Sequence, residues 1–252
     1  MRTSPARRAR LAALSCLIFA TASNAQTTRT RTPVAARPSS AVVVDERLSA
    51  LRDAPELSAA LLQRLGRGRA VTVRGAKTSA DGVVFYRVAV TSRTAGWVQR
   101  EALISPARAG EDERLLRLVR GSDGFDRIER AALFLELFPR SPLRAAALLI
   151  LGDAAEAAGP RLSRDAASRL DAREMEAGGA PAHSYFLNYS GLDRYRRQGI
   201  VYVFDPVTKQ FHYDGAAWRE ILRRHPQSAE AVEARKRLAG VGAPAKSQYR
   251  ER

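Results

Sequence analysis

The sequence contains a single cysteine, Cys16, and only three histidines in 252 residues. Disulfide frameworks and cysteine-ligated metals need several cysteines, and histidine metal sites need closely spaced pairs. The three histidines stand far apart in the chain. No nucleophile elbow, phosphate-binding loop or dinucleotide fingerprint is present either. We therefore expect no metal, no cofactor and no catalytic residue, which is the pattern of a non-enzymatic protein.

Lysine is scarce as well: Lys77, Lys209, Lys236 and Lys246 are the only lysines among 42 basic residues, and the formal net charge is +16. A charge of this size suggests nucleic-acid binding when the basic residues cluster. Here the arginines alternate with acids, as in Asp126-Arg127-Ile128-Glu129-Arg130. Such spacing is typical of solvated helix surfaces. We predict weak attraction to anionic lipids or wall polymers and no specific nucleic-acid partner.

Residues 1–25 have the features of a cleavable signal peptide. Several arginines precede a short apolar run, "LAALSCLIFATA", and Ser23 and Ala25 fit the cleavage site. The run is too short to span a bilayer as a stable helix. We expect cleavage after Ala25 and export to the periplasm or the medium, with no transmembrane span left. An uncleaved anchor is one alternative. Acylation of Cys16 is another, although Cys16 lies early in the run for a lipoprotein.

Residues 26–41 are polar, contain prolines and show no periodicity, which predicts a flexible leader. From residue 42 short strands alternate with turn residues. Asp81-Gly82 is a turn pair, and it precedes a strand over residues 83–90. Several short strands without a strong helix signal predict a small closed β-barrel over residues 42–106. The side chains expected to share one strand face are Val84, Tyr86, Val88 and Val90.

Four short patterns occur in order along this segment: Leu51-Arg52 before Pro55; Leu65, Gly68, Val71 and Val73; Phe85-Tyr86-Arg87-Val88; and Gly96-Trp97-Val98 before Leu103. In these patterns the segment resembles a bacterial SH3-type (SH3b) domain, although that family more usually has Trp at the position of Phe85. The resemblance implies a binding module for peptidoglycan or a peptide.

The candidate ligand-binding residues of the SH3-type segment are Phe85, Tyr86 and Trp97, because aromatic side chains supply a large contact area. The alternative is that Tyr86 and Trp97, which alternate with valines, belong to the core. In that case Phe85 is the exposed residue of the three.

After residue 110 the apolar period becomes helical. Residues 111–122 and 124–138 predict two helices, and Pro139 ends the second. Ser141 and Pro142 predict the start of a buried helix over residues 143–158, with Gly159-Pro160 as its end. One more helix is expected over residues 161–179, a loop over 180–191 and a short helix over 191–198.

A weak internal repeat links Phe138–Gly152 to His225–Gly240. Pro139 and Ser141 match Pro226 and Ser228, and an apolar helix precedes each proline. The pattern resembles tetratricopeptide-like helical hairpins, especially those of bacterial envelope-assembly proteins. The spacing of 87 residues departs from the repeat of about 34 in that family. We predict stacked helical hairpins over residues 111–240.

Between the two copies, residues 200–213 predict a β-hairpin with its turn at Asp205–Lys209. Asp214 is expected to cap the following helix, which contains Trp218. Tyr202, Phe211 and Tyr213 are candidate partner-contact residues if they are exposed, and the alternative is that they pack onto the helices. Residues 241–252 predict a disordered tail.

The sequence therefore predicts an α+β multidomain protein: a small SH3-like β-barrel followed by an all-α, tetratricopeptide-like region with one inserted β-hairpin. We expect an exported binding or adaptor protein of the bacterial cell envelope. Its barrel would bind peptidoglycan or a protein peptide, and its helices would dock an envelope protein. The alternatives are a pure wall-binding module, a protein–protein scaffold without wall affinity, a charge-driven nucleic-acid binder and an accessory of a wall hydrolase.

Overall fold

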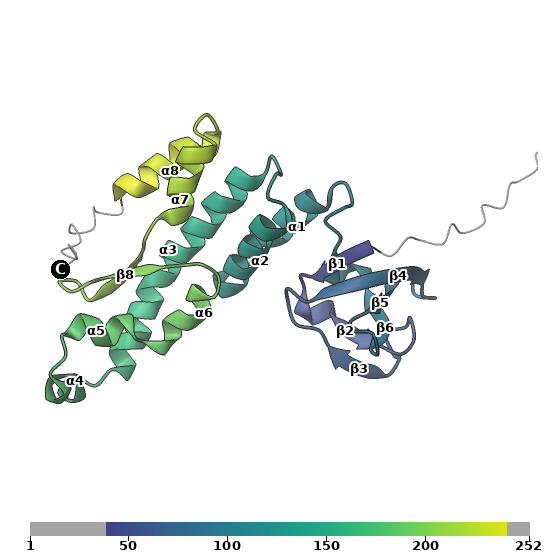
Figure 1. Cartoon of the computed structure of the whole chain (residues 1–252), viewed down its shortest axis with the longest axis horizontal. Coiled ribbons are helices and arrows are strands. Elements are labelled where there is room, and N and C mark those ends of the chain that lie inside the picture. Colours follow the sequence, from purple (N-terminus) through teal and green to yellow (C-terminus); the bar gives the residue numbers. More distant parts are fainter. Residues whose placement is uncertain (1–38, 241–252) are drawn as a thin grey trace, which may run out of the picture. The chain divides into compact units, whose positions relative to one another are not determined.

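The computed structural model describes residues 39–240, all within one compact unit. An antiparallel sheet forms first, and helices with one inserted β-hairpin follow, so the protein is α+β as predicted (Figure 1). The predicted signal peptide (1–25), nearly all of the leader and the tail (241–252) lie outside the described residues. Across residues 39–240, every helix is too short or too polar to cross a membrane.

The sheet has seven strands in the order β3-β2-β6-β5-β4-β1-β7, with every neighbouring pair antiparallel. It begins at Ser39, slightly before the predicted boundary at residue 42. The strands are β1 (Ser39–Val43), β2 (Ala50–Arg52), β3 (Leu61–Arg64), β4 (Ala70–Thr78), β5 (Val84–Ala89), β6 (Ala95–Gln99) and β7 (Leu103–Ile104), with short 3₁₀ turns at Glu46–Leu48 and Arg100–Ala102.

The prediction of a closed barrel is wrong. β3 and β7 are the two edges of the sheet, and no pairing joins them within residues 39–240. The strands still curve around one core, because Leu51 of β2 and Leu103 of β7 are buried in the same cluster. The edge strands β3 and β7 do not pair because β7 is short and its Ile104 packs with the helical core.

The face predicted for β5 is confirmed. Tyr86 and Val88 are buried in the sheet core, and Val84 and Val90 pack at its margin. Alternation along a strand places every second side chain on the same face. Arg87 is exposed on the opposite face, which is where a ligand could reach the sheet.

The helices of the second half confirm most predicted positions. The predicted loop over residues 180–191 is wrong, because α5 forms there and the Phe186 ring stacks on Phe204 at 4.3 Å. Tertiary packing therefore stabilises a helix that is too short to be stable alone. The elements are α1 (Glu111–Arg120), α2 (Gly124–Leu137), α3 (Arg144–Arg169), α4 (Ala172–Gly178), α5 (Ala182–Leu187), a 3₁₀ turn (Ser190–Leu192), α6 (Asp193–Arg196), β8 (Tyr202–Asp205), β9 (Gln210–Tyr213), α7 (Ala216–Arg224) and α8 (Ala229–Gly240).

Helix α3 does not end at Gly159-Pro160, which corrects a second prediction. It continues to Arg169 because β9 packs directly against it. A Cβ atom at Gly159 would lie 2.4 Å from the carbonyl oxygen of Phe211. The Ser163 hydroxyl donates to the Gly159 carbonyl at 2.8 Å and accepts from the Phe211 N–H at 2.8 Å. Gly159 therefore serves a close approach of two backbones and not a helix end.

The internal repeat is visible in the backbone hydrogen bonds. In the first copy the Phe138 N–H donates to Phe134 and the Ser141 N–H to Phe138. In the second copy His225 donates to Ile221 and Ser228 to His225, at the matching positions. Both serine hydroxyls also accept an N–H from the start of the following helix, Leu143 or Ala231. The predicted hairpins, α2 with α3 and α7 with α8, therefore share one turn geometry.

The sheet and the first helices share a hydrophobic core. Val42, Val44 and Ile104 belong to the same cluster as the leucines of α1. At this junction Arg130 of α2 is 3% exposed, and its Nε donates to the Val44 carbonyl at 3.2 Å. The Arg130 Nη2 lies 3.5 Å from Asp45, which is 5% exposed. The junction is therefore both apolar and ionic.

The close approach at Gly159 makes a first prediction. Gly159→Ala should lower the free energy of unfolding by about 1–3 kcal/mol, the usual cost of overpacking a tight contact, because the new methyl group would collide with the Phe211 carbonyl. Urea unfolding of the full chain measures this. Gly75→Ala is the matched control, since a Cβ there meets nothing within 4 Å. Equal stability of both variants and the wild type would contradict the proposed contact.

The junction makes a second prediction. The Arg47 guanidinium, which donates to Asp45 at 2.9 Å and 2.7 Å, lowers the pKa of the Asp45 carboxyl, although burial opposes this. A lowered pKa stabilises the fold above the usual aspartate pKa of about 3.9, and that contribution is lost as the pH falls through the lower folded value.

Asp45→Asn should therefore cost about 2–4 kcal/mol at roughly pH 7, because Arg130 stays buried without its carboxylate. The difference from the wild type should shrink as the pH approaches about 3. Urea unfolding at several pH values measures it, with Asp53→Asn as the control. A pH-independent difference would show that ionic pairing is not the cause.

Candidate binding site

Two of the three aromatic residues predicted to bind a ligand on the sheet are buried. Phe85 is 0% exposed, so the expectation that it is the exposed residue is wrong. It lies on β5, in the interior of the sheet, between Lys77 of β4 and Gln99 of β6 in the strand register. Tyr86 is buried in the sheet core, and its hydroxyl accepts a hydrogen bond from Arg108. Neither ring lines an open groove.

Trp97 is half-buried and is the one member of this set with part of its side chain at the surface. It is flanked on β6 by Gly96 and Val98, which face the core. A Cβ at Gly96 would lie 2.6 Å from the Arg52 carbonyl and 2.9 Å from the Leu51 side chain. The glycine of the Gly-Trp-Val motif therefore lets β2 cross close to β6, and this places Arg52 beside Trp97.

The three hairpin aromatics predicted to contact a partner are also buried. Tyr202, Phe211 and Tyr213 are 7%, 0% and 2% exposed, so they do not form a contact surface. The Tyr202 hydroxyl donates to the Ala155 carbonyl at 2.7 Å, and burial raises its pKa well above the usual range. Burial likewise raises the pKa of Tyr213 to about 12. The hairpin turns these rings toward α3 because that helix offers the apolar surface.

The strand register brings four side chains into one row across the outer face of the sheet. Arg52 of β2 pairs with Leu61 of β3 on one side and with Trp97 of β6 on the other. Trp97 in turn pairs with Arg87 of β5. Directly paired residues of antiparallel strands project to the same face. We call the set Leu61, Arg52, Trp97 and Arg87 the Trp97 row.

The Trp97 row combines an aromatic ring with positive charge. Arg52 is held in place by a 2.6 Å hydrogen bond from its Nη1 to the Ala59 carbonyl. Arg87 is exposed, and neither arginine forms an ion pair with a carboxylate of residues 39–240. Two guanidinium groups without an ion pair in this range, beside a tryptophan, suit a ligand with a carboxylate and a flat or apolar group.

The Trp97 row continues into an apolar edge. Leu61 is 50% exposed at the edge strand β3, and Leu62 beside it is also 50% exposed, because the register shifts between Leu51 and Arg52. Leu57, in the loop before β3, is 44% exposed. An accessible apolar cluster of this kind commonly marks a contact surface.

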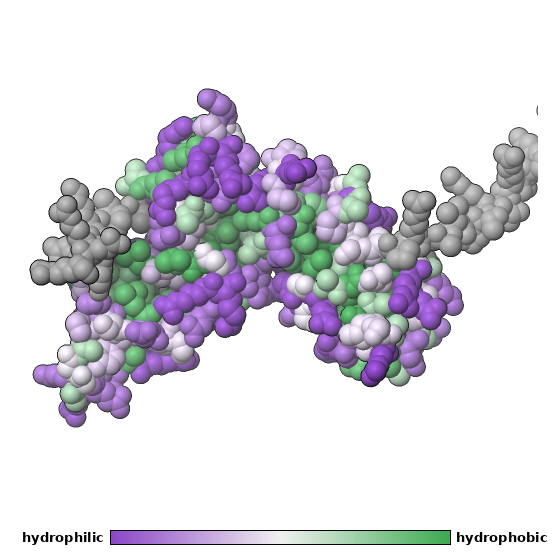
Figure 2. All heavy atoms as spheres, in the orientation of Figure 1, coloured by the Kyte–Doolittle hydropathy of each residue, from purple (hydrophilic) through white to green (hydrophobic). Residues whose placement is uncertain are grey.

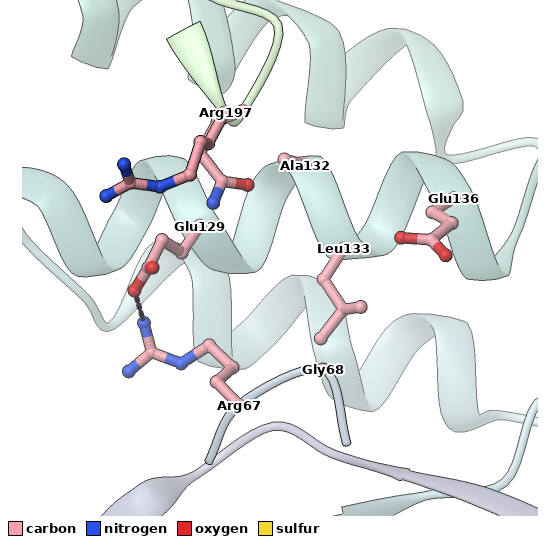
Figure 3. Close-up of a pocket in the computed structure, with 8 residues that line it drawn as sticks. Arg67, Gly68, Glu129, Ala132, Leu133, Glu136 and Arg197 are labelled. Atoms are coloured by element: carbon pink, nitrogen blue, oxygen red, sulfur yellow. Dashed lines mark hydrogen bonds and ion pairs between the residues drawn. The ribbon is translucent and has the colours of Figure 1, made fainter. Parts of the chain in front are cut away.

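A separate polar hollow of about 390 Å³ lies where the loop after β3 meets α2 (Figure 3). Arg67 and Gly68 line it from the loop, and Glu129 and Leu133 line it from α2, with Arg197 nearby. Arg67 pairs with Glu129 and, at 3.3 Å, with Asp126. Burial raises the pKa of Glu129, although the Arg67 charge opposes this. The ion pairs of Arg67 with Glu129 and Asp126 therefore join the loop to α2, while Glu136 and Arg197, which also line the hollow, form no ion pair within residues 39–240.

The helical arginines differ from those of the Trp97 row because many of them are paired. Hydrophilic residues cover much of the surface over α7 and α8 (Figure 2). Arg237 pairs with Asp153 at 3.1 Å, and Arg144 pairs with Glu220 at 2.8 Å. The Arg237–Asp153 pair is exposed and fits the predicted solvated helix faces, where such pairs contribute little stability, whereas the Arg144–Glu220 pair is partly buried.

The histidine and carboxylate side chains of residues 39–240 are not arranged as metal ligands. Within residues 39–240, no three His, Cys, Asp or Glu side chains are grouped so that they could hold a metal ion. The His212 Nδ1 lies 3.3 Å from Glu156, but Glu156 also accepts the Tyr213 N–H at 2.8 Å. This pair ties β9 to α3, which is a structural role.

Sequence reasoning identified Trp97 but missed its two arginine neighbours. Arg52 and Arg87 both belong to the sequence patterns on which the SH3-type resemblance rests. Each lies next to a buried residue in a strand whose side chains alternate between the two faces. That alternation was sufficient to place them on the outer face. Their position beside Trp97 depends on the pairing of β2, β6 and β5, which the sequence does not specify.

Comparison with family models, with curated proteins and with solved structures gave no match to this chain.

Proposed function

We propose that this is a non-enzymatic adaptor of the bacterial cell envelope whose sheet domain, of SH3 type, binds peptidoglycan at the Trp97 row. The observation that carries the proposal is the half-buried Trp97 between two arginines that form no ion pair with a carboxylate of residues 39–240. Peptidoglycan consists of sugar rings and short peptides that carry carboxylates. The row offers a complementary group for each part.

Each residue of the row has a distinct role in this proposal. The Trp97 ring stacks on a sugar ring or an apolar peptide side chain. Arg87 and Arg52 bind carboxylates of the peptide, since a guanidinium presents two parallel donors to a carboxylate. Arg52 is already oriented by the Ala59 carbonyl, so less entropy is lost when it binds.

The helical half supplies the adaptor part of the proposal. The two hairpins, α2 with α3 and α7 with α8, repeat one turn geometry, as tetratricopeptide-like repeats do. Stacked helical hairpins offer extended surfaces for protein partners. We propose that an envelope protein docks on this half. Export by the signal peptide at residues 1–25 belongs to the same proposal.

The first experiment is sedimentation of the chain from residue 26 to 252 with purified peptidoglycan. Trp97→Ala should weaken retention about tenfold or more, as for a central aromatic contact. Arg87→Gln should weaken it about fivefold, whereas Arg93→Gln, an exposed arginine in the β5–β6 turn, should not change it. Thermal unfolding checks that each variant folds. Wild-type retention in Trp97→Ala would contradict the assigned site.

The second experiment separates this site from simple charge attraction. Retention on peptidoglycan should persist from low to physiological salt, because stacking on Trp97 is not screened. Binding to duplex DNA, measured in parallel, should fall steeply with salt, as counterion release requires. If both ligands are lost together as salt rises, the Trp97 row is not a specific site, and the protein–protein scaffold becomes the better hypothesis.

A further inference from the structure

A second hollow lies in the segment that the sequence predicted as a loop. It has a volume of about 540 Å³ and is formed by the end of α3, the turn before α5, α5 itself and the turn that follows. Pockets for small ligands commonly measure about 300–1,000 Å³. Its lining residues are Arg169, Leu170, Ala180, Ser184, Tyr185, Asn188, Tyr189 and Ser190.

The two tyrosines of this hollow differ from the other tyrosines of residues 39–240. The hydroxyls of Tyr86, Tyr195, Tyr202 and Tyr213 each form a hydrogen bond within the protein. Within the same residues, those of Tyr185 and Tyr189 form none, although Tyr189 is only 7% exposed. Neither hydroxyl oxygen is among the fully buried polar atoms, so both are accessible at the hollow. The two tyrosines without such a hydrogen bond line the same hollow.

The other polar side chains of the hollow also keep their hydrogen-bonding capacity. Arg169 forms no ion pair with a carboxylate of residues 39–240, and the hydroxyls of Ser184 and Ser190 form no hydrogen bond there. Asn188 donates from Nδ2 to the Ser184 carbonyl at 2.8 Å, which orients the amide and leaves Oδ1 as an acceptor. Several donors and acceptors that have no partner within residues 39–240 thus line one hollow, and those of Arg169, Asn188 and Ser190 belong to exposed residues.

Two glycines allow the tyrosines to take these positions. A Cβ at Gly178 would lie 2.1 Å from the Tyr185 hydroxyl oxygen, and a Cβ at Gly191 would lie 2.3 Å from the Tyr189 ring. Both rings therefore pack against the backbone at points where any side chain would displace them. Because each ring is held by the backbone, it loses little freedom when it binds.

From these observations we infer that the hollow binds an acidic saccharide. Flat rings beside unused hydroxyl, amide and guanidinium groups match a sugar ring, which has apolar faces and many hydroxyls. Arg169 is the one charged residue among those that line the hollow, so the sugar carries a carboxylate that pairs with it. A nucleotide is less suitable, because its phosphates call for more than one cation. This inference goes beyond the proposed function and does not depend on the Trp97 row.

The test uses trigalacturonate, a chain of three uronic acids, as the probe for the chain from residue 26 to 252. Calorimetric titration should show saturable binding, and the methyl ester, which lacks the charge, should bind about tenfold more weakly. Tyr185→Phe and Tyr189→Phe should each weaken binding about fivefold, because each removes only one hydroxyl. These two variants should fold, since neither hydroxyl forms a hydrogen bond within residues 39–240.

Matched controls separate the hollow from general charge effects. Arg169→Gln should weaken binding about tenfold, whereas Arg173→Gln, an exposed arginine of α4, should not change it. Tyr195→Phe, outside the hollow, should bind like the wild type. Absence of saturable binding, equal binding of the methyl ester, or wild-type binding by the two tyrosine variants would overturn the inference. Equal binding of a tri-aspartate peptide would also overturn it.

Discussion

The buried Arg130 guanidinium is the interaction on which the arrangement of the two halves depends. It lies on α2, donates to the Val44 carbonyl next to β1 and faces Asp45, while its Nη1 donates to the Ser122 hydroxyl after α1. A guanidinium can leave water only when such partners surround it. The strand, the turn and the helix must therefore be in place together. The shared apolar core of Val44, Ile104 and the α1 leucines excludes water from this contact.

The packing of the sheet against the helices also determines which surfaces of the sheet remain accessible to a ligand. One face of β5 and β6 is used by the sheet core, and β1 and β7 also contribute Val42 and Ile104 to the helical core. The outer side of β2, β6 and β5 is left over, and there the strand register collects Arg52, Trp97 and Arg87. A rigid sheet holds these side chains more firmly than a loop would, which suits the binding role proposed for them.

Local patterns predicted the elements well, because alternation and helical periodicity report burial directly. The face shared by Tyr86 and Val88, the hairpin over residues 200–213 and the serine turns of the repeat all follow from such patterns. Long-range packing explains the failures. Phe85 looks exposed beside buried Tyr86, but it is fully buried although it shares its strand face with the exposed Arg87. Gly159-Pro160 looks like a helix end, but β9 packs there. The Trp97 row and the tyrosine hollow depend on strand pairing and on α5, so neither was visible in the sequence.

The continuation of α3 through Gly159-Pro160 also accounts for the long spacing of the repeat. If α3 stopped at Gly159, β9 would lose both the backbone contact at that glycine and the hydrogen bond to the Ser163 hydroxyl. With α3 extended to Arg169, its first part packs against α2 and α7, and its later part supports β9. The segment from α4 to β9 is therefore an insertion between two helical hairpins, and it carries the tyrosine hollow.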